Sequence, residues 1–308
     1  MNWIVLAMGA YFLLSIESIA NKFLISGKVG SWRLYLFYIG LLSFTSLMFA
    51  PFGLYWPGWQ VVGISVFTGI IFFGYLAFLF SSLKGSTATR VFVLIGAVAT
   101  ITTFVFSKLF LEDSLTTGKL IGVALLLFGG FFISFKIKEK QFFTDYKKVV
   151  IAGLLSGISL GMLKYTFDIF DKLGGTDFEV FVNGYIYTRM GSVVMVLFLM
   201  CLPGYRNHII ATFKKKKGRE HAINFLFVVG VKTLSGIATF MMNFALSIGD
   251  PTIVSALGSV QYLGVFLLSL GLSERFGSIL KEDLDRRDLV FKSVGVLLVV
   301  LGIIIVFI

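Results

Sequence analysis

The chain has 308 residues, of which 57% are hydrophobic and only 14% are charged, and its mean hydropathy is +0.93. Because a soluble globular protein carries about 25% charged residues, this composition excludes an ordinary soluble domain and makes the lipid bilayer the expected partner. The formal net charge of +11 does not indicate nucleic-acid binding, because the basic residues lie in short connections between apolar segments.

Ten apolar segments follow one another along the chain, each close to the 20 or so residues that a helix needs to cross a bilayer. Glycine is common and proline stands only at segment ends, as expected for closely packed membrane helices. The sequence therefore predicts an all-α membrane protein with ten transmembrane helices. The expected spans are 3–25, 33–53, 59–82, 88–110, 117–136, 148–172, 179–203, 222–247, 252–273 and 289–308.

The fifth and tenth spans share a residue pattern. The segment KLIGVALLLFGG begins at Lys119, and KSVGVLLVVLGI begins at Lys292. An odd number of spans per half inserts the two halves in opposite orientations, an arrangement found in secondary transporters with sites near the midplane. We therefore expect two inverted five-helix repeats, residues 1–140 and 147–308.

The distribution of lysine and arginine predicts the orientation. Connections after the first, third, fifth, seventh and ninth spans hold 20 basic residues, whereas the other connections hold only Lys119 and Lys172. Basic connections face the cytoplasm, so we expect a cell-membrane protein (plasma or inner membrane) with both termini outside.

Taken together, the span count, the repeat and a recurring pattern of glycine and glutamate resemble the EamA branch of the drug/metabolite transporter superfamily. The matching positions are Gly85, Glu112, Gly122 and Gly129 in the first half and Gly249, Glu274, Gly295 and Gly302 in the second. The resemblance implies a ten-helix transporter of small metabolites. Family members often carry a proline midway along the fourth and ninth spans, where this chain has Gly96 and Gln261 and no proline.

Charged side chains deep in a membrane are costly and are therefore candidates for function. Glu17 and Lys232 are expected on one side of the midplane, and Lys164 and Arg189 on the other. Asn21 follows Glu17 by four residues and shares its helix face. The candidate substrate-binding residues are Glu17, Asn21, Lys22, Lys164, Asp168, Arg189, Lys232, Asn243, Gln261 and Tyr262.

Several of these residues have a structural alternative. Lys164 and Asp168 can pair within one helix, and Glu17 and Lys232 can form a buried pair that joins two helices. If the charged candidates face a cavity instead, their net charge of plus two favours a substrate with a carboxylate or phosphate group. Glu17 would then meet an amino group or exchange a proton.

Other features are best explained by structure. Gly153, Gly157 and Gly161 predict a face of the sixth span that another helix approaches closely. Asp250 and Pro251 predict the N-cap and first residue of the ninth helix. Glu112 and Glu274 can each stabilise the start of a following helix.

Both histidines, His208 and His221, lie in the basic connection after the seventh span, as does the run Lys214–Lys217. We expect this connection to be a solvated loop. Without a histidine in any span, and with Cys201 at a span end, we expect neither an intramembrane enzyme nor a metal site. The sequence likewise indicates no cofactor.

The sequence thus predicts a secondary transporter that moves a small polar metabolite, an amino acid or an organic anion, by alternating access, with export as the expected direction. The first alternative is a proton-coupled exporter of cationic, drug-like compounds that uses Glu17. A more distant alternative is a membrane scaffold that transports nothing. The sequence leaves the oligomeric state and the coupling ion open.

Overall fold

The computed structural model describes residues 2–27, 32–82, 88–111, 115–134, 146–214, 219–272 and 286–308. Within these ranges every regular element is helical. In chain order the elements are α1 (Trp3–Gly27), α2 (Trp32–Leu42), η1 (Ser43–Phe52), α3 (Trp59–Ser82), α4 (Ala88–Phe106), η2 (Ser107–Leu111), α5 (Thr117–Ser134), α6 (Tyr146–Leu173), α7 (Asp177–Cys201), α8 (Pro203–Lys214), α9 (Arg219–Ile248), α10 (Pro251–Ala256), α11 (Gly258–Leu272) and α13 (Arg286–Phe307).

Ten stretches of this described chain are long and apolar enough to cross a membrane. Each falls on one of the ten predicted spans, so the span count is confirmed and the chain is a multi-pass helical membrane protein. Helices suit this environment because each satisfies its own backbone hydrogen bonds.

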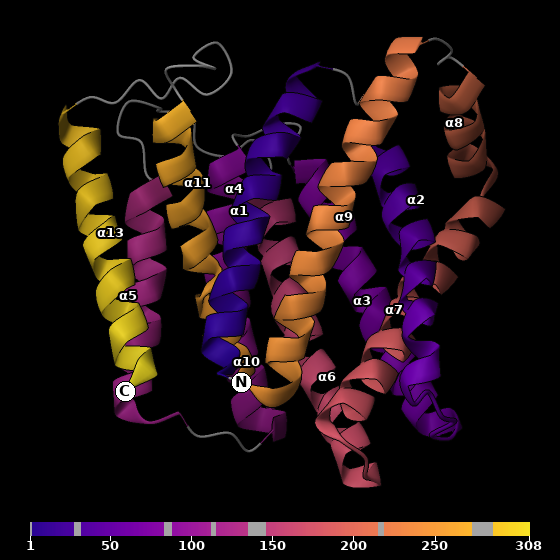
Figure 1. Ribbon diagram of the computed structural model, residues 1–308, viewed down its shortest axis with the longest axis horizontal. Helices are drawn as coiled ribbons and strands as arrows, with labels where there is room; N and C mark the ends of the chain where they lie inside the picture. Colours follow the sequence, from indigo (N-terminus) through magenta and orange to yellow (C-terminus); the bar gives the residue numbers. More distant parts are fainter. Residues whose placement is uncertain are drawn as a thin grey trace.

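The spans form two rows that pack against each other (Figure 1). Neighbouring helices of the first row are in the order α9, α1, α11, α5 and α13, and those of the second are in the order α2, α7, α3, α6 and α4. The rows meet where α10 packs on α4 and α6, and where α9 packs on α7. Both chain ends lie at the same end of the bundle (Figure 1).

Three spans depart from a continuous α-helix. The second continues from α2 into the 3₁₀ segment η1, which contains Pro51, and the fourth ends in the π-helical turn η2. The ninth is interrupted at Leu257, between α10 and α11. The sequence did not predict this interruption, because no proline marks it; instead, Gly258 follows Leu257 and begins α11.

Glycines set the closest helix contacts. A Cβ at Gly153 would meet Val98, and one at Gly157 would lie 2.5 Å from the carbonyl oxygen of Ala99, both on α4. A Cβ at Gly161 would meet the ring of Phe106. The predicted close approach along the glycine face of the sixth span is therefore confirmed, and α4 is the helix that approaches.

The four matched glycines of the two halves meet in one contact, which we term the glycine interface: Gly122, Gly129, Gly295 and Gly302. A Cβ at Gly129 would lie 2.8 Å from the carbonyl oxygen of Gly295, and one at Gly302 would lie 2.9 Å from that of Gly122. The pairing of an early residue of α5 with a late residue of α13 makes these two helices antiparallel. Their backbones touch along most of their length.

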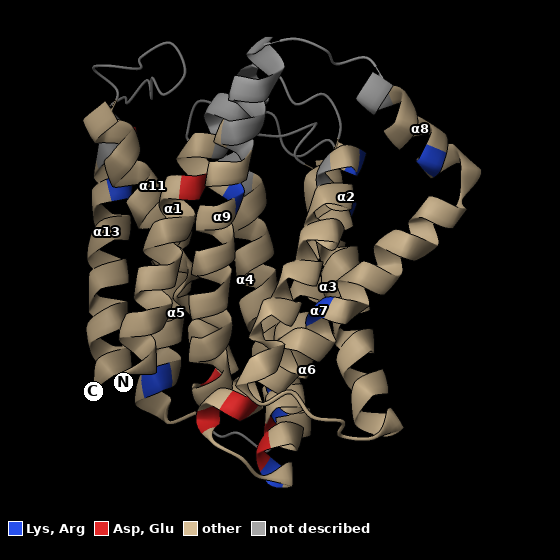
Figure 2. Cartoon of the chain, turned by 45° about the vertical axis from the view of Figure 1, so that its right-hand side comes forward, with Lys and Arg blue, Asp and Glu red and all other residues tan. Residues whose placement is uncertain are grey.

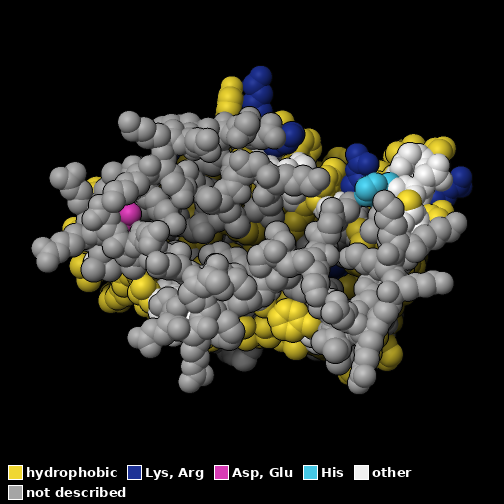
Figure 3. Space-filling model, turned by 90° about the horizontal axis from the view of Figure 1, so that it is seen from above, with side chains coloured by type: hydrophobic (Ala, Val, Ile, Leu, Met, Phe, Trp, Pro, Cys, Tyr) yellow, Lys and Arg dark blue, Asp and Glu magenta, His cyan; other side chains and the backbone are white. Residues whose placement is uncertain are grey.

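The connection after the seventh span is not a loop as expected. It holds the helix α8, which includes His208, and α9 already begins at Arg219, before His221. Tyr205 fixes α8 to the start of α2 by donating a hydrogen bond to the carbonyl oxygen of Arg33 at 2.8 Å. Burial raises the pKa of Tyr205 to about 12, so its hydroxyl stays protonated and keeps this bond. Basic side chains and a histidine gather over α8 when the molecule is seen from above (Figure 3).

Several sequence features lie outside the described residues. They are Gly85, Glu112, Glu274 and the lysines at 215–217.

Candidate functional site

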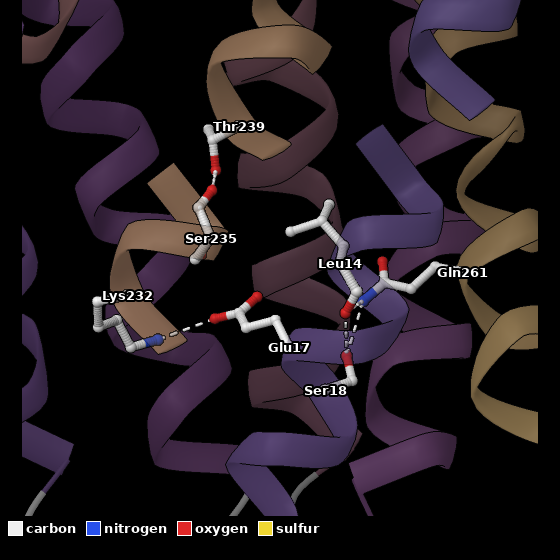
Figure 4. Close-up of polar contacts among 7 residues, drawn as sticks. All are labelled: Leu14, Glu17, Ser18, Lys232, Ser235, Thr239 and Gln261. Atoms are coloured by element: carbon white, nitrogen blue, oxygen red, sulfur yellow. Dashed lines mark hydrogen bonds and ion pairs between the residues drawn. The ribbon is translucent and has the colours of Figure 1, made fainter. Parts of the chain in front are cut away.

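An ion pair joins α1 to α9 inside the bundle. The ammonium of Lys232 lies 2.9 Å from Oε1 of Glu17, and the two side chains are only 11% and 12% exposed. Glu17 points from α1 towards α9 (Figure 4). The interhelical pair that the sequence offered as one alternative is therefore present, between residues 215 positions apart.

The other side of α1 carries a second polar contact. The amide nitrogen of Gln261, on α11, donates to the Ser18 hydroxyl at 2.9 Å, and that hydroxyl donates to the carbonyl oxygen of Leu14. Figure 4 shows Ser18 and Gln261 on the side of α1 away from Lys232. Helix α1 is thus held on both sides by polar side chains, which are expensive in lipid unless they find partners.

Tyr262 lies where the two rows meet. Its hydroxyl donates to the carbonyl oxygen of Phe92, on α4, at 2.7 Å. Next to it, Thr100 and Ser255 share a hydrogen bond at 3.0 Å. These three side chains line a small pocket beside the interruption at Leu257, with room for roughly one water molecule. The pocket is too small for a metabolite in this conformation.

Arg189 lies at the centre of α7, with twelve residues of the helix on either side. Its guanidinium carbon is 5.1 Å from the ring centroid of Phe72, on α3, and 5.1 Å from that of Tyr185. Phe72 in turn contacts Tyr75, with ring centroids 5.8 Å apart. An aromatic side chain of α3 therefore borders the guanidinium of Arg189.

The Lys164 side chain serves the end of another helix. It pairs with Asp168 one turn along α6, at 3.1 Å, and donates to the carbonyl oxygen of Ser247 at 3.0 Å. Ser247 lies in the last turn of α9, where carbonyl groups lack helical partners and a cation is favourable. The pair within α6 that the sequence offered as one alternative is present.

The ninth span begins directly after the end of α9. The side chain of Asp250 accepts from the amide of Ile253 at 2.9 Å, and Pro251 is the first helical residue. Both roles predicted for these residues are confirmed.

The remaining candidates are Asn243, Asn21 and Lys22. Asn243 is buried on α9, with 4% of its surface exposed. The side chains of Asn21 and Lys22 lie outside the described residues. The structure therefore brings Glu17 together with Lys232, Lys164 with Asp168, and Gln261 with Ser18, but it does not bring the eight candidates with described side chains around one cavity.

A cluster of aromatic rings connects α9 with α7, which we term the aromatic interface: Phe181, Tyr185, Phe240 and Phe244. Phe181 contacts Phe240 and Phe244 with ring centroids 4.8 and 5.1 Å apart. Phe49 of η1 stacks on Phe240 at 4.8 Å. No pattern in the sequence distinguishes these rings from the many phenylalanines that face lipid.

Sequence reasoning also missed two polar anchors. Asn183 is fully buried on α7; it donates to the carbonyl oxygen of Gly53 at 2.9 Å and accepts from the amide of Tyr55 at 3.1 Å. The Tyr11 hydroxyl donates to the carbonyl oxygen of Val254 at 2.9 Å. The rule that selected Asn243, a polar side chain within an apolar span, would have selected Asn183 as well.

Charged side chains are sparse along the middle of the bundle and gather towards its two ends (Figure 2). No group of three or more histidine, cysteine, aspartate or glutamate side chains that could hold a metal ion occurs in the described ranges.

No family model matches the sequence, and no curated protein is significantly similar to it. A crystal structure described only as "Crystal structure of protein" superposes with a TM-score of 0.67 and 14% sequence identity. The match covers 99% of this chain and 98% of that chain. At this identity the similarity shows that the two chains share a fold.

Proposed function

We propose that the chain is a secondary transporter that moves a small polar metabolite, an amino acid or an organic anion, across the membrane by alternating access. The observation that carries this proposal is the Glu17–Lys232 pair, because two charged side chains are held inside a bundle of membrane helices at 11% and 12% exposure. Intramembrane charges are rare and mark substrate or ion pathways. Export is the direction that we propose.

The helix contacts support an inverted repeat of two five-helix halves. If the first span corresponds to the sixth and the third to the eighth, the contact α1–α9 corresponds to α6–α3, and both contacts are present. In the same correspondence, α1–α11 matches α6–α4, which are also in contact. The glycine interface pairs Gly122 with Gly302 and Gly129 with Gly295, as a two-fold axis between α5 and α13 would require. These contacts favour membership of the EamA branch.

We further propose that the chain lies in the plasma or inner membrane with its termini outside. The basic connections follow odd-numbered spans, and both termini lie at the same end of the bundle (Figure 1). The basic helix α8 would then lie on the cytoplasmic side, near anionic headgroups.

The geometry favours this substrate class over a cationic, drug-like one. An exporter of cations that used Glu17 would need that carboxylate to meet its substrate or a proton, and in this conformation Lys232 lies 2.9 Å from it. A scaffold without transport is also less well supported, because it would have no need for charged side chains between its helices.

Reconstitution into liposomes tests the proposal. Proteoliposomes loaded with unlabelled amino acids or organic acids should accumulate the matching labelled compound by exchange, whereas protein-free liposomes should not. A panel without any exchange, measured on protein whose folding is verified, would contradict transport of this class. An imposed pH gradient that drives uptake of a cation, and fails to do so in Glu17→Gln, would favour the proton-coupled alternative.

A further inference from the structure

Arg189 lies deep within a membrane-spanning helix. It is the central residue of the 25-residue helix α7, about 18 Å from either end at 1.5 Å per residue. A charged side chain at that depth is costly in lipid and is therefore rare. Such a residue has to face the protein interior and interact with other groups there.

The partners of Arg189 leave most of its hydrogen-bonding capacity unused. Phe72 and Tyr185 lie against the guanidinium with ring centroids 5.1 Å from its central carbon. Aromatic faces attract the positive charge, but they accept little from the five N–H donors of a guanidinium. Among the residues that the structure describes, no carboxylate lies within ion-pair distance of Arg189.

The other charged candidates with described side chains have partners of opposite charge. Glu17 pairs with Lys232, and Lys164 pairs with Asp168. The positive charge of Arg189 is therefore not balanced by this set. It attracts an anion into the interior and repels a cation.

We propose that Arg189 binds an oxyanion group of the transported metabolite, a carboxylate or a phosphate, while Phe72 and Tyr185 hold its guanidinium in place. Both groups match the fork of N–H donors, which forms paired charge-assisted hydrogen bonds. This inference rests on the proposed transport function and narrows it to anionic or zwitterionic substrates.

Ligand-induced stabilisation of the purified full-length protein in detergent tests the inference, because a ligand that binds only the folded state raises its melting temperature. The probes are succinate, glutamate, glycerol 3-phosphate and, as a cation, choline. We expect at least one oxyanion to stabilise the protein and choline to have no effect. The apparent Kd for that oxyanion should rise roughly tenfold or more in Arg189→Gln, as for a lost hydrogen bond between charged groups.

Two further variants keep the result interpretable. Arg206→Gln removes an exposed arginine of α8 and should bind the oxyanion as the parent protein does. If Arg189→Gln does not fold, Arg189→Lys keeps the charge but loses the paired geometry, so its affinity should be weaker for every oxyanion. Comparing the apparent Kd for succinate with that for glycerol 3-phosphate distinguishes a carboxylate site from a phosphate site.

Equal oxyanion affinity in the parent protein and in the Arg189 variants would overturn the inference, and so would stabilisation by choline alone or by no probe. Exchange assays in liposomes separate this from the transport proposal. Arg189-dependent binding without any exchange would leave the anion site standing and contradict transport. Exchange that persists unchanged in Arg189→Gln would contradict the anion site and leave the transport proposal standing.

Discussion

The glycine interface and the aromatic interface are built from opposite kinds of residue. At the first, the backbones of α5 and α13 touch, and a single added methyl group at Gly129 would lie 2.8 Å from backbone atoms of α13. At the second, α7 and α9 meet through the rings of Phe181 and Phe240, with centroids 4.8 Å apart. Backbone atoms cannot yield, whereas rings can change rotamer and repack.

This difference suggests different roles in a protein that alternates between conformations. An interface of small residues held by backbone contact fixes two helices relative to each other. An interface of large side chains lets two helices separate and meet again, because the rings adapt. In the proposed transport cycle, α5 and α13 would stay together, and α7 and α9 would move.

The largest effect is expected for the Glu17–Lys232 ion pair. Its lysine lies on α9, the helix that also carries Phe240 of the aromatic interface. Lys232→Met removes the lysine partner of Glu17 and should lower the free energy of unfolding by about 3 kcal/mol, because a partly desolvated carboxylate is left behind. Chemical denaturation in detergent measures this. The double variant Glu17→Gln/Lys232→Met should recover most of the loss; if it is no more stable than the single variant, the pair is not what holds α1 to α9.

The glycine interface should be nearly as sensitive. Gly129→Val places a branched side chain against the backbone of α13 and should cost about 2–3 kcal/mol through overpacking, with a lower melting temperature and a matching loss of exchange activity. Gly63→Val is the matched control, since a Cβ there has nothing within 4 Å. Equal losses in both variants would mean that helix propensity, and not the contact between α5 and α13, sets the effect.

The aromatic interface should respond in activity more than in stability. Phe240→Leu keeps much of the apolar volume and should cost about 1 kcal/mol, while the rate of exchange in liposomes changes several-fold because the contact with Phe49 and Phe181 is altered. A large loss of stability with an unchanged exchange rate would mean that the aromatic interface is a fixed contact like the glycine interface. It would contradict the different roles proposed for the two interfaces.

The smallest effect is expected at the junction of the two rows. Tyr262→Phe removes the hydrogen bond to the carbonyl oxygen of Phe92 and should cost about 1 kcal/mol. Tyr165→Phe, at a position with 37% of its surface exposed, serves as the control and should be neutral. Thermal unfolding of the two variants side by side makes the measurement.

The span count could be predicted from sequence because lipid demands about 20 apolar residues for each crossing, and the ten segments meet that demand. The N-cap at Asp250 and the close approach of another helix to Gly157 followed from local rules that need no knowledge of the fold, but the identity of that helix, α4, did not. Helix α8 was missed because its basic and polar residues, such as Arg206 and His208, are typical of a loop.

The site was only partly accessible from sequence for a different reason. Depth along a helix can be counted, which selected Glu17 and Lys232, but the direction in which each side chain points depends on how the rows pack. Lys164 illustrates this, because its ammonium bonds to a carbonyl of α9, a contact that spacing within α6 does not specify. The interruption at Leu257 has no proline, so no local signal marked it.

The turn between α6 and α7 has a mechanical consequence. Only residues 174–176 connect the two helices; Gly174 and Gly175 have φ angles of 92° and 126°, and Thr176 and Glu179 form a reciprocal capping box at the start of α7. Because the turn is short and is held by this capping box, α6 and α7 would move together as one rigid unit. In the proposed transport cycle, a swing of α7 away from α9 would be transmitted through α6 to its glycine face, and from there to α4, which borders the pocket at Tyr262.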